Sequence, residues 1–276
     1  MPELPEVETV RRGLAPVLEG RTLERVQLRR ESLRFPFPDG FGQRLTGKQV
    51  KSVSRRAKFL MITLEDGTVL ISHLGMSGRF RIFKDTPPAL EAHDHVILQT
   101  SDGVEIRYND PRRFGFMDLT SEEELGTYPM LNRLGPEPVH PGLDGKALAE
   151  RLAGRGAPIK AALLDQAVIA GIGNIYACEA LHMAGISPRR KARTVQGKRA
   201  GRLATAIQDV LMRAIEAGGS SLRDHRQPSG ELGYFQHRFQ VYGRTGEGCP
   251  RCGESHPIAQ ITQSGRSTFF CSRCQR

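Results

Sequence analysis

The sequence has no tryptophan, and aromatic residues make up only 6% of its 276 residues. A broad aromatic platform on which single-stranded bases stack is therefore not expected. No apolar run approaches the roughly 18 residues that a membrane-spanning helix needs. The first residues also lack the basic and then apolar order of a secretory signal. We therefore expect an intracellular, cytoplasmic protein without a membrane partner.

The sequence has fewer acidic than basic residues, and it has few cysteines. Thirty Asp and Glu stand against forty Lys and Arg, which gives a formal net charge of +10. Such an excess of positive charge indicates a polyanionic partner, and nucleic acid fits best. Only five cysteines are present, and four of them lie between 249 and 274. This crowding argues against a disulfide framework and indicates a metal site, whereas Cys178, in an apolar stretch, is expected to be a small buried hydrophobe.

The pattern along the chain changes from strands to helices. Short β-rich runs between turn residues fill positions 22–119, among them FLMITL, TVLISHL, RFRIF, HVILQT and VEIRYND, and predict a β-sandwich or barrel. LGPEPVHPGLDG is the best linker candidate. Positions 144–217 carry apolar residues three and four apart and predict four helices. We place an N-terminal domain at 1–133, a linker at 134–143, a helical domain at 144–236 with a long loop at 218–236, and a metal-binding finger at 237–276.

Cys249, Cys252, Cys271 and Cys274 form a C-x2-C-x18-C-x2-C array. Two tight turns at this spacing present four thiolates to one Zn²⁺, and the closed shell predicts a structural and not a catalytic metal. The enclosed QITQSGRSTFF reads as two strands around a turn with Arg266 at the tip. Arg266 there can either contact a phosphate or be an idle solvated charge.

AGIGNIY joins two apolar helical stretches and is not a dinucleotide fingerprint, because Tyr176 replaces the third glycine and a helix precedes it. Gly171 and Gly173 permit a tight turn, and Asn174 can cap the following helix. The N–H groups at such a helix start favour an anionic phosphate. An ordinary corner between two helices would have the same requirements.

HLGMSGRF and NDPRRFGF place Met76, Arg112 and Phe114 in glycine-containing turns at strand edges. Such side chains can wedge into a base stack, the apolar ones filling the space of an extruded nucleotide and the arginine meeting the orphaned base. Packing in the protein core is the competing interpretation for Met76 and Phe114.

The opening MPELPEVETVRRGL contains a helix over 5–18, with Pro5 at its first turn, but leaves Pro2 and Glu3 unexplained. Removal of Met1 would make Pro2 the N-terminal residue with a secondary amine. Since α-amino groups have a pKa of about 7.7 to 8.0, roughly a third of such an amine is neutral at pH 7.5. Attack on a sugar C1′ would give an iminium that has no N–H to lose and acidifies the C2′ proton. Glu3 could supply protons to the opening sugar.

Together, MPELPEVETVRRGL, RRAKFL, HLGMSGRF, NDPRRFGF, LLDQAVIAGIGNIYACEAL, FQVYGR and the four-cysteine finger closely resemble the bacterial formamidopyrimidine-DNA glycosylase family along nearly the whole chain. The resemblance implies an α+β multidomain fold: an N-terminal β-sandwich with flanking helices, then a helix-two-turn-helix domain with a β-hairpin zinc finger. It implies a bifunctional DNA glycosylase and abasic-site lyase. Such an enzyme removes 8-oxoguanine and formamidopyrimidines from double-stranded DNA, nicks by β,δ-elimination, acts as a monomer and associates with the nucleoid.

The resemblance also assigns roles to individual residues. Pro2 matches the nucleophile and Glu3 the proton donor, with Glu6 as a second acid near the site. Lys58 matches a lysine that contacts phosphate near the lesion, and Lys160 one that handles the damaged base. The remaining matches are DNA contacts: Asn174 and Arg266 on phosphate, and Met76, Arg112 and Phe114 as the void-filling trio. The loop between Arg223 and Gly230 departs from the family, so Ser220 and Ser221 are only candidates for base contacts.

Two other interpretations compete. An endonuclease VIII type enzyme favours oxidised pyrimidines, but its members usually begin MPEGPE, and Leu4 argues against it. A zinc-bearing DNA-binding module without catalytic activity would explain every basic and cysteine feature. Only Pro2 and Glu3 distinguish it from an enzyme, because a binder needs neither.

Overall fold

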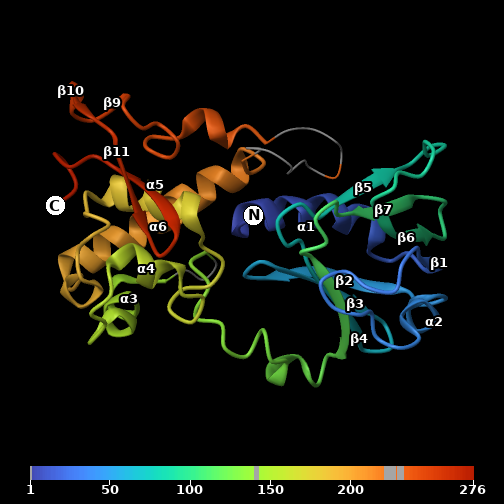
Figure 1. The fold of residues 1–276 in the computed structure, drawn as a ribbon. Coiled ribbons are helices and arrows are strands. Elements are labelled where there is room, and N and C mark those ends of the chain that lie inside the picture. Colours follow the sequence, from blue (N-terminus) through green and yellow to red (C-terminus); the bar gives the residue numbers. More distant parts are fainter. Residues whose placement is uncertain (1, 140–142, 221–227, 229–232) are drawn as a thin grey trace. The chain divides into compact units, whose positions relative to one another are not determined.

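The computed structural model describes residues 2–139, 143–220, 228 and 233–276. These residues form two compact units. The first contains the described residues of 1–132 and 217–234, and the second contains those of 133–216 and 235–276. Figure 1 identifies the elements of each unit along the chain.

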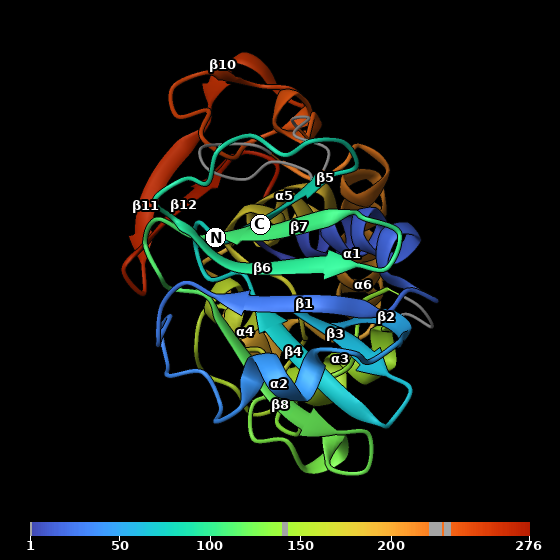
Figure 2. The ribbon, with the colours of Figure 1, turned by 90° about the vertical axis from the view of Figure 1, so that its right-hand side faces the viewer.

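The first unit contains two four-stranded antiparallel sheets, two α-helices and one short 3-10 helix (Figure 2). One sheet has the order β1-β6-β7-β5, and the other has the order β2-β3-β4-β8. Its elements are α1 (Leu4–Leu18), β1 (Leu23–Leu28), α2 (Phe41–Leu45), β2 (Val50–Arg56), β3 (Phe59–Leu64), β4 (Thr68–His73), β5 (Arg79–Phe83), β6 (Asp94–Thr100), β7 (Glu105–Asn109), β8 (Phe116–Ser121) and the short helix η1 (Leu125–Thr127).

One hydrophobic core joins both sheets to α1. It contains Leu60 of β3, Leu98 of β6 and Leu14 of α1, each no more than 1% exposed. Because apolar residues of both sheets and of the helix meet in this core, the unit is a β-sandwich with α1 packed on β2 and β3. The N-terminus of α1 is thereby fixed to the sheets.

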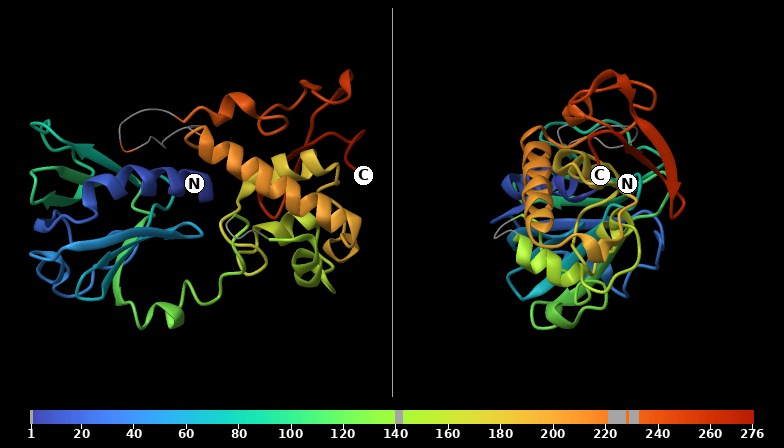
Figure 3. Two further views of the ribbon diagram at one scale, coloured as in Figure 1. Left: turned by 180° about the vertical axis from the view of Figure 1, so that it is seen from behind. Right: turned by 90° about the vertical axis from the view of Figure 1, so that its left-hand side faces the viewer.

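The second unit is helical, with a terminal pair of hairpins. It contains α3 (Gly145–Leu152), α4 (Ile159–Leu164), α5 (Asn174–Ala184), η2 (Ala192–Thr194), α6 (Lys198–Glu216) and η3 (Phe235–Arg238), followed by β9 (Gly248–Cys249), β10 (Gly253–Pro257), β11 (Ala259–Gln263) and β12 (Arg266–Phe270). The long α6, orange in Figure 3, packs against α3 and α5. Its apolar positions recur at helical spacing, and all of Leu203, Ile207 and Leu211 are buried.

The four predicted helices of positions 144–217 are present, and the five quoted strands are β3 to β7. The second predicted helix is shorter than its apolar pattern, because α4 ends at Leu164 and the chain then turns at Asp165. The described residues of 217–234 group with the first unit, although the sequence placed the loop 218–236 in the helical domain. The finer division at 1–133, 134–143, 144–236 and 237–276 stays a prediction, and residues 140–142 of the linker lie outside the described part. None of the described helices is long and apolar enough to cross a membrane.

Candidate functional site

The first residues are buried at the start of α1. Glu3 is the N-cap residue, and its backbone N–H donates to Glu6 Oε2 at 2.8 Å in a capping box. The other oxygen of Glu6 accepts from the backbone N–H and the hydroxyl of Ser220, at 2.8 and 3.0 Å. Glu6 thus joins the start of α1 to the segment that ends at Ser220. Glu3, only 3% exposed, is the acid adjacent to Pro2.

Ser220, a candidate for base contact, is therefore bound to Glu6 in this structure. Gly219 precedes it at φ 78°, and a Cβ there would lie 3.1 Å from the Glu6 side chain. A glycine allows this backbone to approach the carboxylate. Ser221, the other candidate for base contact, lies outside the described residues.

Lys58 lies in the two-residue turn between β2 and β3, where Arg56 pairs with Phe59. It is 6% exposed. Arg55 Nη1 supports the turn by donating to the Ala57 carbonyl at 2.9 Å. Burial, followed by the charges of Lys58 and Arg34, lowers the pKa of His73 to about 4. His73 is therefore neutral at pH 7, and its Nδ1 accepts the backbone N–H of Gly75 at 3.1 Å.

Met76, Arg112 and Phe114 come from two touching loops of the first unit. Met76 is 37% exposed and Phe114 is 45% exposed. The Arg112 guanidinium carbon lies 4.8 Å from the centre of the Phe114 ring. A Cβ on Gly75 would fall 2.2 Å from the Phe114 carbonyl carbon, so the two loops meet backbone to backbone. The exposure of both apolar side chains argues against the core-packing interpretation.

Asn174 is the first residue of α5 and not its cap, so the capping prediction was wrong. Gly173 is the N-cap, and the Asn174 side chain instead donates to the Ser267 carbonyl of β12 at 2.9 Å. The turn before it uses Gly171 at φ 88°, as the sequence predicted. Gln166 supports this turn by accepting the Gly171 N–H at 2.9 Å and donating to the Ile172 carbonyl at 3.0 Å. The start of a helix is a place where backbone N–H groups can bind an anion.

Lys160 is fully buried in α4 and also contacts β12. Its ammonium group donates to the Ser267 carbonyl at 3.1 Å and to the Thr268 hydroxyl at 2.7 Å. Ser264 and Gly265, both at positive φ, form the turn before Arg266, which pairs with Gln263 and is exposed. The structure therefore brings Lys160, Asn174 and Arg266 together around one hairpin.

Four cysteine sulfurs gather at the end of the second unit. The Sγ atoms of Cys249, Cys252, Cys271 and Cys274 all lie within 4.8 Å of one another. Tetrahedral thiolate ligands with Zn–S bonds of about 2.3 Å lie about 3.8 Å apart, which matches the 3.9 Å between Cys249 and Cys274. His182 Nε2 lies 3.5 Å from Cys249 Sγ and can orient it. Cys178 is 1% exposed and packs in the same small core, as predicted.

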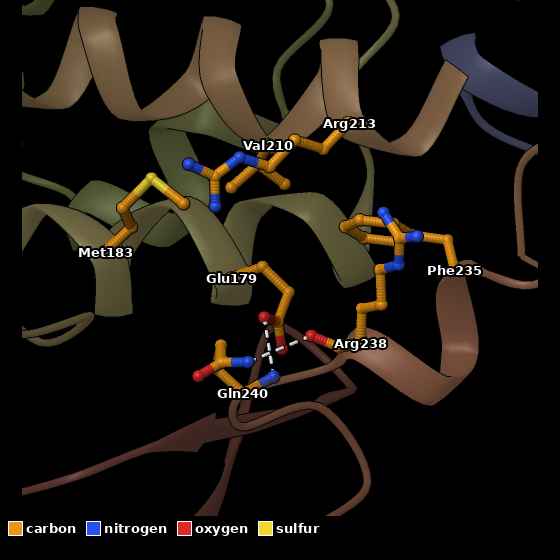
Figure 4. Close-up of a pocket in the computed structure, with 7 residues that line it drawn as sticks. All are labelled: Glu179, Met183, Val210, Arg213, Phe235, Arg238 and Gln240. Carbon is orange, nitrogen blue, oxygen red and sulfur yellow. Dashed lines mark hydrogen bonds between the residues drawn. The ribbon is translucent and has the colours of Figure 1, made fainter. Parts of the chain in front are cut away.

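A buried carboxylate in α5 organises the segment that leads into the finger. Glu179 accepts the backbone N–H groups of Gln240, Val241 and Tyr242 at 2.9, 3.0 and 2.8 Å. Burial raises the pKa of Glu179, and these three donors oppose the shift. Figure 4 shows the carboxylate directed at Gln240 from one wall of a cavity of about 500 Å³. The cavity is lined by Glu179, Met183, Val210, Arg213, Phe235, Arg238 and Gln240.

Tyr242, held by Glu179, places its hydroxyl 3.5 Å from Asn174 Nδ2 and stacks edge to face on Phe269 of β12. Sequence reasoning missed Glu179, although an acid inside the apolar stretch NIYACEALHMA was a usable signal. It also missed Ser77 and Asp110, which lie within the quoted motifs HLGMSGRF and NDPRRFGF.

Known proteins share this arrangement over the whole chain. Three family models match: the formamidopyrimidine-DNA glycosylase N-terminal domain over residues 1–117, the corresponding H2TH domain over 134–226, and the zinc finger found in FPG and IleRS over 246–276. A formamidopyrimidine-DNA glycosylase from Beijerinckia indica subsp. indica is 57% identical, with both chains covered completely. The chain belongs to the formamidopyrimidine-DNA glycosylase family.

Solved structures of this family agree with the fold. A Lactococcus lactis FPG variant in complex with Fapy-dG containing DNA has a TM-score of 0.90 at 37% identity, with both chains covered completely. The wild-type Lactococcus lactis protein in complex with oxidized pyrimidine containing DNA has a TM-score of 0.89 at 37% identity and the same coverage. Like its family, the chain is a two-part α+β protein whose cysteine finger is a site for one structural Zn²⁺.

Proposed function

We propose that this formamidopyrimidine-DNA glycosylase family member excises oxidised purines, 8-oxoguanine and formamidopyrimidines, from duplex DNA. It then nicks the abasic site by β,δ-elimination and acts as a single chain. The observation that carries the proposal is the Pro2-Glu3 pair, buried at the start of α1 in a chain that matches the family from end to end. Its substrate is genomic DNA, so we propose the bacterial cytoplasm, at the nucleoid, as its location.

The chemistry begins with the secondary amine that Pro2 has once Met1 is removed. The nitrogen attacks C1′, the bond between C1′ and the base breaks, and the base leaves with a proton. Opening of the sugar ring gives a cationic iminium on Pro2. The iminium draws electrons from the C2′–H bond, and loss of that proton expels the 3′ phosphate. A second elimination expels the 5′ phosphate.

Glu3 is the proposed proton carrier, because it is the acid adjacent to the amine. Protonation of the sugar oxygen by its carboxyl group assists ring opening, and the carboxylate can later accept a proton. Glu6 fixes this geometry through Ser220 and the Glu3 N–H. Lys58, in the turn between β2 and β3, would bind a phosphate of the damaged strand.

The remaining residues bind DNA. Asn174, at the start of α5, and Arg266, beside the finger turn, would hold phosphates, and the four-cysteine zinc site keeps the finger folded. Lys160 and the Asn174 amide both hold the β12 backbone at Ser267, so we propose that Lys160 places Arg266 instead of contacting the base. Met76, Arg112 and Phe114 would fill the space of the extruded nucleotide.

Substitutions at the N-terminus test the proposal against the DNA-binding module. We expect Pro2→Gly and Glu3→Gln to reduce base release and nicking of 8-oxoguanine opposite cytosine by at least about 100-fold, with duplex binding retained. Glu24→Gln, an exposed carboxylate on β1, is the matched control. Full excision and nicking by both variants would show that Pro2 and Glu3 are not the catalytic pair. Duplex binding without excision by the unmodified protein would leave only the binding function.

A parallel assay with oxidised pyrimidines tests the endonuclease VIII alternative. We expect 8-oxoguanine to be released faster than oxidised pyrimidines by the unmodified protein. The opposite order would overturn the proposed substrate class while leaving the nucleophile in place.

A further inference from the structure

Asp110 is a fully buried carboxylate for which the proposed chemistry has no use. Its Oδ1 accepts the Ser77 hydroxyl at 2.5 Å, and its Oδ2 accepts the backbone N–H of Gly115 at 2.8 Å. Tyr108 Oη lies 3.5 Å from Oδ2. His95 Nε2 lies 2.9 Å from the Asp110 backbone oxygen. Both carboxylate oxygens are thus occupied within the protein.

These bonds join two loops that are separate in sequence. Ser77 follows Met76 directly, and its hydroxyl oxygen accepts the backbone N–H of Arg112 at 3.2 Å. Gly115 follows Phe114 directly. A single buried carboxylate therefore reaches the residues adjacent to Met76 and Phe114, and through Ser77 it also reaches Arg112 itself.

The glycines of the two loops make the arrangement compact. A Cβ on Gly115 would fall 1.8 Å from Tyr108 Oη, and one on Gly78 would fall 2.3 Å from the same atom. Because these positions admit no side chain, the loops can close on the Asp110 carboxylate and the Tyr108 hydroxyl. The buried polar groups hold the backbone while Met76 and Phe114 stay exposed.

We propose that Asp110, acting through Ser77, is a positioning residue that fixes Met76, Arg112 and Phe114 as one preorganised wedge. The inference rests on the proposed function of these three side chains. A wedge whose loops are fixed before binding loses less conformational freedom when it enters the base stack. Loosening the loops should therefore impair the opening of the duplex and leave the chemistry at Pro2 intact.

Ser77→Ala tests this inference, because it removes the bridging hydroxyl and leaves the bond between Asp110 and Gly115. We expect excision of 8-oxoguanine opposite cytosine to fall between about 10-fold and 100-fold. The fluorescence rise of 2-aminopurine placed beside the lesion should shrink at saturating protein. Cleavage of a single-stranded abasic site, which has no partner strand to open, should be unchanged, and Ser77→Thr should restore excision.

Two further variants distinguish failure of the positioning inference from failure of the proposed wedge. Ser72→Ala removes another fully buried hydroxyl of the same sheet unit, one with no hydrogen-bond partner among the described residues, and should behave like the unmodified protein. A Ser77→Ala variant that also behaves like the unmodified protein would overturn the inference. If Phe114→Ala also left the fluorescence unchanged, the proposed wedge would be refuted, and the positioning inference would be refuted with it.

Hydrogen exchange gives an answer even if Ser77→Ala fails to fold. In the unmodified protein the amides of Arg112 and Gly115 should exchange slowly despite their place in a surface loop, because each donates to a buried acceptor. Rapid exchange at both amides would contradict the proposed positioning.

Discussion

At the scale of single residues, buried polar groups carry most of the site's organisation. Glu6, Asp110, Lys160 and Glu179 are each no more than 3% exposed. Glu6, Lys160 and Glu179 bind backbone groups of a segment distant in sequence, and Asp110 binds the distant Ser77 hydroxyl and the nearby Gly115 N–H. Leaving a buried donor or acceptor without its partner costs about 1 to 3 kcal/mol. These residues therefore fix the loops on which the exposed functional side chains are placed.

A substitution of Lys160 tests whether this residue positions the finger hairpin or contacts the damaged base. Lys160→Met removes the donor to the Ser267 carbonyl and the Thr268 hydroxyl while keeping most of the side chain's volume. We expect the free energy of unfolding of the second unit to fall by about 1 to 3 kcal/mol, together with weaker binding of undamaged DNA. Urea unfolding and anisotropy titration measure both. Unchanged stability with a selective loss of 8-oxoguanine excision would instead indicate a base contact.

His73 should make the stability of the first unit decrease at acidic pH. Its pKa is lowered from 6.5 to about 4 in the folded protein, mainly by burial, so the unfolded chain binds more protons between these values. Stability should therefore fall as the pH drops from 6.5 to 4, by up to about 3 kcal/mol from this residue. Urea unfolding of the unmodified protein and of His73→Phe should show a smaller loss in the variant. Parallel pH curves would contradict the assignment.

Sequence reasoning singled out residues that stand in local sequence patterns and missed those whose contacts span long stretches of the chain. Pro2, Glu3 and the four cysteines stand in short recognisable spacings. Asp110 and Ser77 are 33 positions apart, and Glu6 and Ser220 are 214 positions apart. No periodicity in the sequence links such pairs, because their contact depends on the packing of the sheets.

At the scale of elements, the finger hairpin is positioned by two helices. Lys160 of α4 and Asn174 of α5 both donate to the Ser267 carbonyl of β12, next to Arg266. The strands were predictable from their alternation and the hairpin from Ser264-Gly265. The cap of α5 was not, because the Asn174 side chain forms a long-range bond in place of the local one.

Removal of zinc tests this element directly. Chelation, or Cys252→Ser, should unfold the finger, because a hairpin this small cannot bury a core of its own. Affinity for duplex DNA should fall by at least about 10-fold, while the Pro2 amine still reacts with a single-stranded abasic site. Affinity retained after complete metal removal would show that the finger does not hold the DNA.

At the scale of the whole molecule, the net charge of +10 should control binding. Phosphate contacts release counterions, so the logarithm of the binding constant should fall linearly with the logarithm of the salt concentration. Arg266→Ala should reduce that slope by about one, and Glu24→Gln should leave it unchanged or slightly steeper. A flat salt response would contradict the electrostatic interpretation.

The grouping of segments at this scale was the hardest feature to predict. The sequence assigned the loop at 218–236 to the helical domain, yet Glu6 binds Ser220, and Tyr234 pairs with Ser220 beside the N-terminus. One carboxylate in α1 therefore joins a distant segment to the first unit. Composition and periodicity do not reveal such a bond.

The proposed chemistry depends on the N-terminal proline as the nucleophile. We would incubate the protein with duplex DNA carrying 8-oxoguanine opposite cytosine, add borohydride, and locate the crosslinked peptide by mass spectrometry. We expect a single crosslink at Pro2 with Met1 removed. A crosslink at a lysine, or none although the duplex binds, would contradict it.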